Sequence, residues 1–187
     1  MRVIAGIAKS LPLKAPDGMD TRPTTDRIKE TLFNIINQDL ADCVFVDFFS
    51  GSGGIGIEAL SRGAKKVYFV EQNRKALDCI KANLLFTKLI DNSIILAMDI
   101  LAAVDRIAEK EVDIIFMDPP YASNLENGLL KQLANASYVT ENTLLIVEAD
   151  CNKSFDFVKE YGFSILREKN YKTNKHVFLM KKQDEEL

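Results

Sequence analysis

Short apolar runs alternate along this chain with amphipathic segments, a pattern that predicts strands separated by helices. Strands are predicted over residues 44–48, 66–70, 93–97, 113–117 and 143–147, and helices over 56–62, 74–86, 100–109, 125–136 and 155–161. Two last strands, over 164–169 and 176–181, are expected to pair antiparallel. Apolar strands that alternate with helices predict an α/β fold, in which a mostly parallel sheet is covered by helices on both faces.

The N-terminal part has a different pattern. Extended runs flank Gly6 and a turn signal follows them, so residues 1–22 are expected to form a small β-hairpin appendage. Helix-start residues then precede apolar residues at helical spacing, which predicts a helix over about 25–38. We interpret residues 1–187 as a single domain that consists of the appendage (1–22), a helical segment (23–40) and a Rossmann-like catalytic core (43–182).

The composition is that of an ordinary globular protein of 187 residues, with 47% hydrophobic and 27% charged residues. No apolar run approaches the roughly 18 residues of a membrane span, and no secretory signal is visible, so we expect a cytoplasmic protein without membrane contact. The cysteines lack CxxC spacing and are interpreted as buried, reduced thiols: Cys43, Cys79, Cys151. We expect no bound metal, and a monomer by default.

The net charge of −3 does not favour broad contact with nucleic acid, so any such contact must be local. The first thirty residues carry six basic side chains against four acidic ones. Within this segment, Lys9, Lys14, Arg22 and Arg27 are candidates for phosphate contacts.

The loop after the first core strand carries a glycine pattern. Gly51, Gly53 and Gly56 match GxGxxG, which lets the backbone turn tightly and approach a ligand at a helix N-terminus. The pattern alone is weak, because a tight glycine turn without any ligand has the same sequence. Its position between a strand and a helix favours a nucleotide-like cofactor, and Phe49 and Ser52 are expected to contact it.

Acidic residues lie at or just after the ends of the first three core strands. Glu71 can accept hydrogen bonds from ribose hydroxyls, and Asp99, with Ile100 beside it, can receive an adenine amino group. Both a nicotinamide dinucleotide and S-adenosylmethionine fit these two acids. Asp47 favours S-adenosylmethionine, because a carboxylate would repel a pyrophosphate but attract the cationic sulfonium.

The fourth core strand is followed by Asp118-Pro119-Pro120-Tyr121. The prolines make a rigid turn and remove two backbone donors, so the remaining carbonyls only accept hydrogen bonds. Asp118 and the Pro119 carbonyl can accept both N–H groups of an exocyclic base amine and direct its lone pair at a methyl donor. Tyr121 offers a flat face for stacking of an extruded base. This tetrapeptide is typical of amino-methyltransferases that act on nucleic-acid bases.

With these motifs the chain resembles the bacterial 16S rRNA guanine-N2 methyltransferases, the RsmD family. The resemblance is carried by residues 2–6, 21–30, 33–35, 51–53 and 58–64, by Glu71 and by 118–121. The block from Arg22 to Glu30 is the most specific part, since general methyltransferases lack it.

The resemblance implies a Rossmann-like, seven-stranded sheet and an N-terminal hairpin that engages RNA. It also implies that residues 21–27, Thr24 among them, border the donor and target pockets, and that the substrate is ribosomal RNA, within the small subunit or its precursor. The hairpin departs from the family, because Lys9-Ser10-Leu11 stands where members carry more basic residues.

Three alternatives remain open at this point. An adenine-N6 methyltransferase of DNA or RNA can share the 118–121 motif, although a DNA enzyme generally needs an added target-recognition region. A nicotinamide-dependent oxidoreductase would leave that motif unexplained. A non-catalytic RNA-binding module on the same fold would not need an intact glycine loop.

His176, the only histidine, is expected to be an ordinary strand residue.

Overall fold

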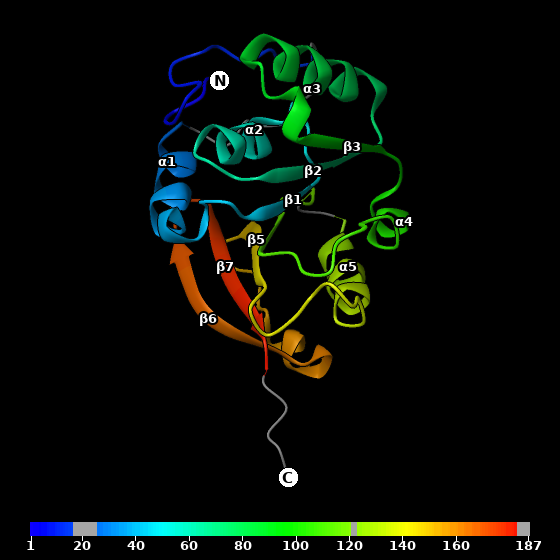
Figure 1. Ribbon diagram of the computed structural model, residues 1–187. Coiled ribbons are helices and arrows are strands. Elements are labelled where there is room, and N and C mark those ends of the chain that lie inside the picture. Colours follow the sequence, from blue (N-terminus) through cyan, green and yellow to red (C-terminus); the bar gives the residue numbers. More distant parts are fainter. Residues whose placement is uncertain (17–25, 121–122, 183–187) are drawn as a thin grey trace.

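The computed structural model describes residues 1–16, 26–120 and 123–182. Its centre is a seven-stranded sheet in the order β3-β2-β1-β4-β5-β7-β6 (Figure 1). Its strands are β1 (Val44–Phe48), β2 (Lys66–Glu71), β3 (Ser93–Ala97), β4 (Ile114–Met117), β5 (Leu144–Asp150), β6 (Phe163–Asn170) and β7 (Asn174–Lys181). The first five run parallel, while β7 pairs antiparallel with both β5 and β6. The α/β fold predicted from the sequence is confirmed.

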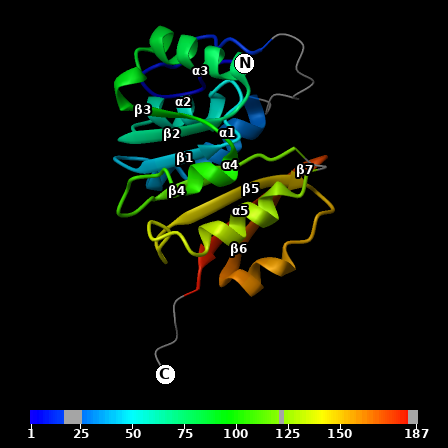
Figure 2. The ribbon, with the colours of Figure 1, turned by 90° about the vertical axis from the view of Figure 1, so that its right-hand side faces the viewer.

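Helices cover both faces of this sheet (Figure 2). The helices are α1 (Asp26–Ile35), α2 (Gly54–Ser61), α3 (Arg74–Thr87), α4 (Ile100–Val104) and α5 (Leu125–Leu133), with short 3₁₀ helices η1 (Asn37–Asp39), η2 (Ile90–Asn92) and η3 (Asp156–Tyr161). Apolar side chains of α1, α2 and α3 form one core cluster with the sheet, and those of α4, α5 and η3 form the other. The inner strands β1, β2, β4 and β5 are buried from both sides, which explains why they are apolar almost throughout, whereas the edge strands β3 and β6 are partly exposed.

Two predicted helices differ from the structure. The segment predicted to be helical to residue 109 ends at Val104, because Glu109 instead accepts hydrogen bonds from Lys66 Nζ and Tyr68 Oη, both at 2.7 Å. The segment predicted over 155–161 is a 3₁₀ helix rather than an α-helix. In both, contacts with neighbouring segments outweigh local helix propensity.

The buried face of α1 does not follow the apolar residues of its sequence, Ile28, Leu32, Ile35 and Ile36, at every position. Leu32, Phe33 and Ile36 are buried, but the fourth buried position on this face is Lys29, not Ile28.

The cysteines also differ from the prediction. Cys43 is buried, and burial raises the pKa of its thiol to about 12. Cys79 and Cys151 are partly exposed, so the prediction that all three cysteines are buried is wrong.

The N-terminal appendage is an antiparallel loop with little regular strand. Within residues 1–16 a single bridge joins Arg2 and Pro12, and the backbone amides of Val3 and Leu13 donate to the carbonyls of Leu11 and Met1. The loop packs beside α2 and α3 (Figure 1).

The strand order places a topological switch point between β1 and β4, where successive connections turn in opposite directions. Ligands in open α/β sheets bind outside the carboxyl ends of the strands at such a point. None of the helices among the described residues is long and apolar enough to cross a membrane.

Candidate active site

A cavity of about 640 Å³ opens at the switch point. It brings together predicted site residues from the ends of β1 and β2 and from the segments that follow β1, β3 and β4: Asp47, Phe49, Gly51, Ser52, Glu71, Asp99, Ile100, Asp118 and Pro120. Gly53 and Pro119 are not part of its lining. Tyr121 lies outside the described residues. Within residues 1–16, 26–120 and 123–182, no group of three or more His, Cys, Asp or Glu side chains is placed to hold a metal ion.

The glycine loop connects β1 to α2, and two of its glycines have distinct reasons to lack a side chain. Gly53 precedes α2 with φ of 82°, in the left-handed region that disfavours other residues. Gly56 lies inside α2, where an added Cβ would come within 2.3 Å of the Phe69 ring. The absence of that Cβ lets α2 pack directly on β2. The loop therefore presents its backbone to the cavity through Gly51, Ser52 and Gly54.

Glu71 ends β2 and holds this loop in place. Its Oε2 accepts from the Gly51 amide at 2.9 Å, and its Oε1 accepts from the amides of Gln72 and Asn73 at 2.9 and 2.8 Å. A carboxylate offers about four acceptor sites, so these bonds leave about one for a ligand hydroxyl. Glu71 therefore shapes the loop and also faces the cavity.

Asp47 lies on β1 and points toward the start of α2. Its Oδ2 accepts from the Gly56 amide at 3.0 Å, and the residue is only 1% exposed. Burial raises the pKa of Asp47 to about 8, the Gly56 amide opposes this, and the negative charge of Glu71 adds to it. A cation bound in the cavity would favour the ionised carboxylate.

Asp99 caps the N-terminus of α4. Its Oδ1 accepts from the amides of Leu101 and Ala102 at 2.9 and 3.3 Å, and no described residue hydrogen-bonds to Oδ2. Ile100 beside it is buried against the cavity. Phe49, across the cavity lining, has φ of 63°, so the strained backbone turns sharply after β1.

Asp118 and the two prolines directly follow β4. The Pro120 carbonyl accepts from the amide and the hydroxyl of Ser123, at 2.9 and 2.7 Å. The Pro119 carbonyl receives no hydrogen bond from a described residue, although Pro119 is buried and is not part of the cavity lining. Asp118 is partly buried at the cavity wall, and its pKa is raised well above the ordinary value by burial, then by the charges of Glu148 and Asp47.

Comparison with known proteins shows to which family this chain belongs. The family model described as Conserved hypothetical protein 95 matches residues 1–180. A Haemophilus influenzae protein named Ribosomal RNA small subunit methyltransferase D is 33% identical over 178 residues, which cover 90% of this chain and 88% of that protein. The chain belongs to the RsmD family of methyltransferases.

Other members of the RsmD family are similar to this chain in sequence and in structure. YlbH of Bacillus subtilis, named as an rRNA methyltransferase, is 38% identical over 152 residues, covering 80% of this chain and 83% of that protein. The solved structure of the methyltransferase yhhF of Escherichia coli superposes with a TM-score of 0.84 at 30% identity, covering 97% of both chains. A methylase structure from H. influenzae gives 0.80 at 28% identity, covering 98% of this chain and 99% of that one.

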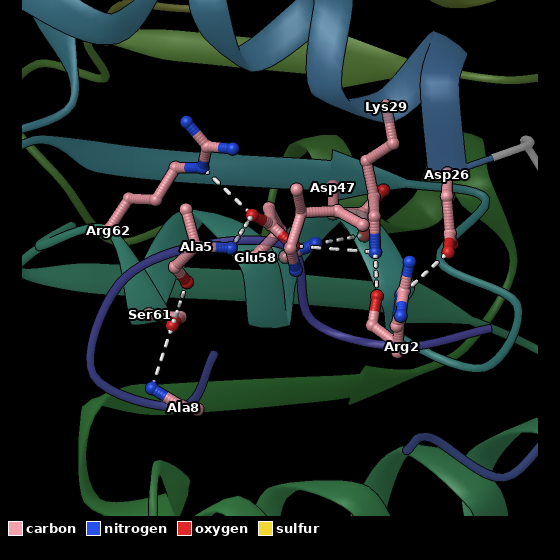
Figure 3. A network of polar contacts seen from close by, with 11 residues as sticks. Arg2, Ala5, Ala8, Asp26, Lys29, Asp47, Glu58, Ser61 and Arg62 are labelled. Atoms are coloured by element: carbon pink, nitrogen blue, oxygen red, sulfur yellow. Dashed lines mark hydrogen bonds and ion pairs between the residues drawn. The ribbon is translucent and has the colours of Figure 1, made fainter. Parts of the chain in front are cut away.

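The family block at 22–30 contributes a cavity residue that sequence reasoning missed. Lys29 of α1 lines the cavity, and its side chain is fully buried. Its Nζ donates to the Arg2 carbonyl at 2.6 Å and lies 3.4 Å from Glu58 Oε2 (Figure 3). Burial holds the Lys29 pKa below its ordinary value, and Glu58 partly offsets this. The sequence does contain a signal for this burial. Lys29 precedes Leu32 and Phe33 by three and four positions, which places the three side chains on one face of the helix.

Glu58 of α2 is the anchor of the N-terminal loop. Its carboxylate accepts from the amides of Ile4 and Ala5 at 2.7 and 3.0 Å and from Arg62 Nε at 2.8 Å, in addition to the Lys29 ion pair (Figure 3). With 0% exposure it is surrounded by partners on all sides. One carboxylate therefore joins the N-terminal loop, α1 and α2.

The N-terminal loop itself forms part of the cavity wall. Met1, Ala15 and Pro16 line the cavity, which composition alone does not indicate. Asn83 of α3 fixes the end of this loop: it pairs with both backbone groups of Lys14, and its Nδ2 also donates to the Ser52 carbonyl at 2.9 Å. The loop is thereby linked to the glycine loop.

The structure describes only some of the residues that are predicted to contact RNA. Lys9 and Lys14 of the N-terminal loop and Arg27 of α1 are exposed. Arg22 and Thr24 lie outside the described residues. The exposed three belong to the segments that Glu58 and Asn83 join to the cavity.

Proposed function

We propose that this protein transfers a methyl group from S-adenosylmethionine to the exocyclic N2 amine of a guanine in 16S ribosomal RNA. The observation that carries the proposal is that Asp118 and the glycine loop border one cavity, together with Glu71. A cofactor site and an acceptor for an amine are thus side by side. The family and the rRNA methyltransferase names of its relatives support an RNA substrate. Such a reaction belongs in the cytoplasm, where ribosomal subunits assemble.

The residues present fit the cofactor. Glu71 retains an acceptor site for a ribose hydroxyl, and Asp99 Oδ2 can receive an adenine amino group. Asp47 offers a carboxyl group that a cationic sulfur bound in the cavity would hold in its ionised form. When bound there, S-adenosylmethionine supplies an electrophilic methyl group.

The acceptor side is formed by Asp118 and the Pro119 carbonyl. Both can accept from the two N–H groups of an exocyclic amine, which directs the nitrogen lone pair at the methyl group. The amine nitrogen attacks the methyl carbon, the carbon–sulfur electron pair stays with sulfur, and the nitrogen becomes cationic. Asp118 then takes up the proton that the nitrogen releases. The choice of guanine rests on the resemblance over residues 22–30, which general methyltransferases lack.

The test uses purified protein, labelled methyl donor, and small subunits from cells that lack the modification, with digestion to nucleosides. Label is expected in N2-methylguanosine. Label only in N6-methyladenosine, or in the protein fraction, would overturn the assignment. Naked 16S rRNA, assayed in parallel, identifies the form of the substrate.

The Asp118→Ala variant tests the proposed chemistry. We expect it to lose at least about a hundredfold in single-turnover rate while its cofactor affinity stays within a few-fold, since positioning and proton transfer are lost but the donor contacts remain. The matched control is Asp91→Ala, at an exposed carboxylate in η2. A variant that keeps more than roughly a tenth of the rate would contradict this role of Asp118.

A further inference from the structure

A second carboxylate lies behind Asp118, on the neighbouring strand. Strands β4 and β5 pair in parallel register with Met117 opposite Val147, so the next residues, Asp118 and Glu148, follow side by side. Glu148 in turn lies opposite His176 on β7. Figure 2 shows β4, β5 and β7 as successive strands. Asp118, Glu148 and His176 therefore form a row across the sheet, on the same face as the cavity residue Phe116.

The two carboxylates differ in their hydrogen-bond partners. Glu148 is 4% exposed, and Asn174 Nδ2 donates to its Oε1 at 2.6 Å while His176 Nε2 lies 3.2 Å from its Oε2. Among the described residues, none donates to the Asp118 carboxylate. Two carboxylates close together in a largely buried site do not readily carry two negative charges, and the one that has hydrogen-bond partners keeps its charge.

His176 is itself held in place. It is fully buried, and its Nδ1 lies 3.1 Å from the Tyr171 hydroxyl, so both ring nitrogens are engaged. The Phe116 ring lies edge-on to it, with centroids 6.0 Å apart. This arrangement fixes the imidazole against Glu148 and limits the movement of that carboxylate.

We propose that Glu148, oriented by His176 and Asn174, is a positioning residue that makes Asp118 the acceptor of the proton released by the substrate amine. This inference rests on the proposed function. As the nitrogen–carbon bond forms and the carbon–sulfur bond breaks, the nitrogen gives one proton to Asp118, whose uptake is favoured by the fixed negative charge beside it. The direction of the Asp118 pKa agrees, since the charge of Glu148 contributes to raising it.

Other charged groups also face Asp118. Asp47 on β1 raises its pKa, as Glu148 does from β5. Glu71, Asp99 and Lys29 line the same cavity from β2, the β3–α4 connection and α1. All of these stay unchanged when Glu148 alone is replaced, so the substitution isolates its charge.

The experiment is the pH profile of the single-turnover methylation rate for Glu148→Gln. The variant should lose about tenfold in the limiting rate at high pH, because Asp118 becomes a weaker base. The midpoint of the acid limb should move down by about one pH unit, because the removed negative charge no longer favours the protonated form. An unchanged midpoint, with or without a lower rate, would overturn the proposal, since a purely structural role predicts that result.

The matched control is Glu168→Gln on β6, which removes a carboxylate that pairs with Lys175 Nζ at 2.8 Å. Its profile should match that of the unmodified protein; a shift of the same size would overturn the assignment to Glu148.

Should Glu148→Gln fail to fold, infrared titration of protein with ¹³C-labelled aspartate carboxyls, minus the spectrum of Asp118→Asn, reports Asp118 directly. Asp118 should remain protonated at a pH where ordinary aspartates are ionised, and titration in the ordinary range would overturn the proposal. This measurement needs no RNA. A lack of any methyl transfer by the unmodified protein would instead count against the proposed function.

Discussion

Asp47 lies within the sheet at 1% exposure, and burial raises its pKa to about 8. In the unfolded chain the same carboxyl ionises near pH 4. Between these values the native protein holds a proton that the unfolded chain has released. Stability therefore falls as the pH rises through this window, and the loss is complete above the folded pKa.

Replacement of Asp47 by Asn should remove this loss. We expect Asp47→Asn to unfold several degrees above the unmodified protein at pH 8, a difference on the order of a few kcal/mol, and to match it near pH 4, where both side chains are neutral. Thermal unfolding at the two pH values measures this. If Asp47→Asn were less stable than the unmodified protein by the same amount at both pH values, the ionisation of buried Asp47 would not be the cause of the pH dependence.

Glu71 is predicted to support the glycine loop and to bind the ligand directly. Glu71→Ala removes a charged acceptor from three backbone amides and from a ribose hydroxyl, so the affinity for S-adenosylmethionine should fall by about 1–3 kcal/mol. Isothermal titration gives this value. Unchanged affinity would mean that Glu71 does not contribute to the cofactor site.

At the scale of elements, the N-terminal loop depends on α2 rather than on its own hydrogen bonds. In its described part, residues 1–16, the only bridge joins Arg2 and Pro12, whereas Glu58 and Ser61 of α2 contact it at several backbone groups. The loop also brings Met1 to the cavity wall. An element of the predicted RNA-binding region is thereby built into the wall of the cavity.

Glu58→Gln should therefore destabilise the protein by about 3–5 kcal/mol, because it leaves the buried Lys29 without its ion-pair partner. Urea unfolding measures the loss, and limited proteolysis should show faster cleavage in the N-terminal loop. The matched control is Glu30→Gln, on the exposed side of α1. A loss of less than about 1 kcal/mol would show that the anchor is redundant.

At the scale of the whole molecule, the net charge of −3 limits binding of RNA to local contacts. Lys9, Lys14 and Arg27 are exposed on the two segments that meet at Glu58. Lys110 is also exposed, but it precedes β4, at the edge of the sheet opposite to the cavity.

RNA affinity should fall as the salt concentration rises, and each of Lys9→Ala, Lys14→Ala and Arg27→Ala should reduce the slope of log K against log salt by about one. Filter binding with a 16S rRNA fragment at several salt concentrations gives the slopes. Lys110→Ala should leave the slope unchanged. Equal slopes for all four variants would place the RNA contacts elsewhere.

The alternation of apolar strands and amphipathic helices was enough to predict the α/β fold. Burial on both faces forces such strands to be apolar, and the helical period of the intervening segments is equally visible in the sequence. The predictions were wrong where a distant partner decided the local structure. Glu109 turns toward Lys66 and Tyr68 instead of extending α4, and Lys29 occupies a core position of α1 because Glu58 lies opposite.

The sequence by itself also determined which residues lie at or just after the ends of the parallel strands, and thereby that Asp47, Glu71, Asp99 and Asp118 meet at one edge. Only the tertiary structure decided which partners these carboxyls have. It places Met1 and Lys29 in the cavity, ties Glu71 to the glycine loop, and sets Glu148 and His176 behind Asp118. Strand ends follow from local periodicity, whereas the pairing of side chains depends on which strands become neighbours, and segments far apart in the chain decide that.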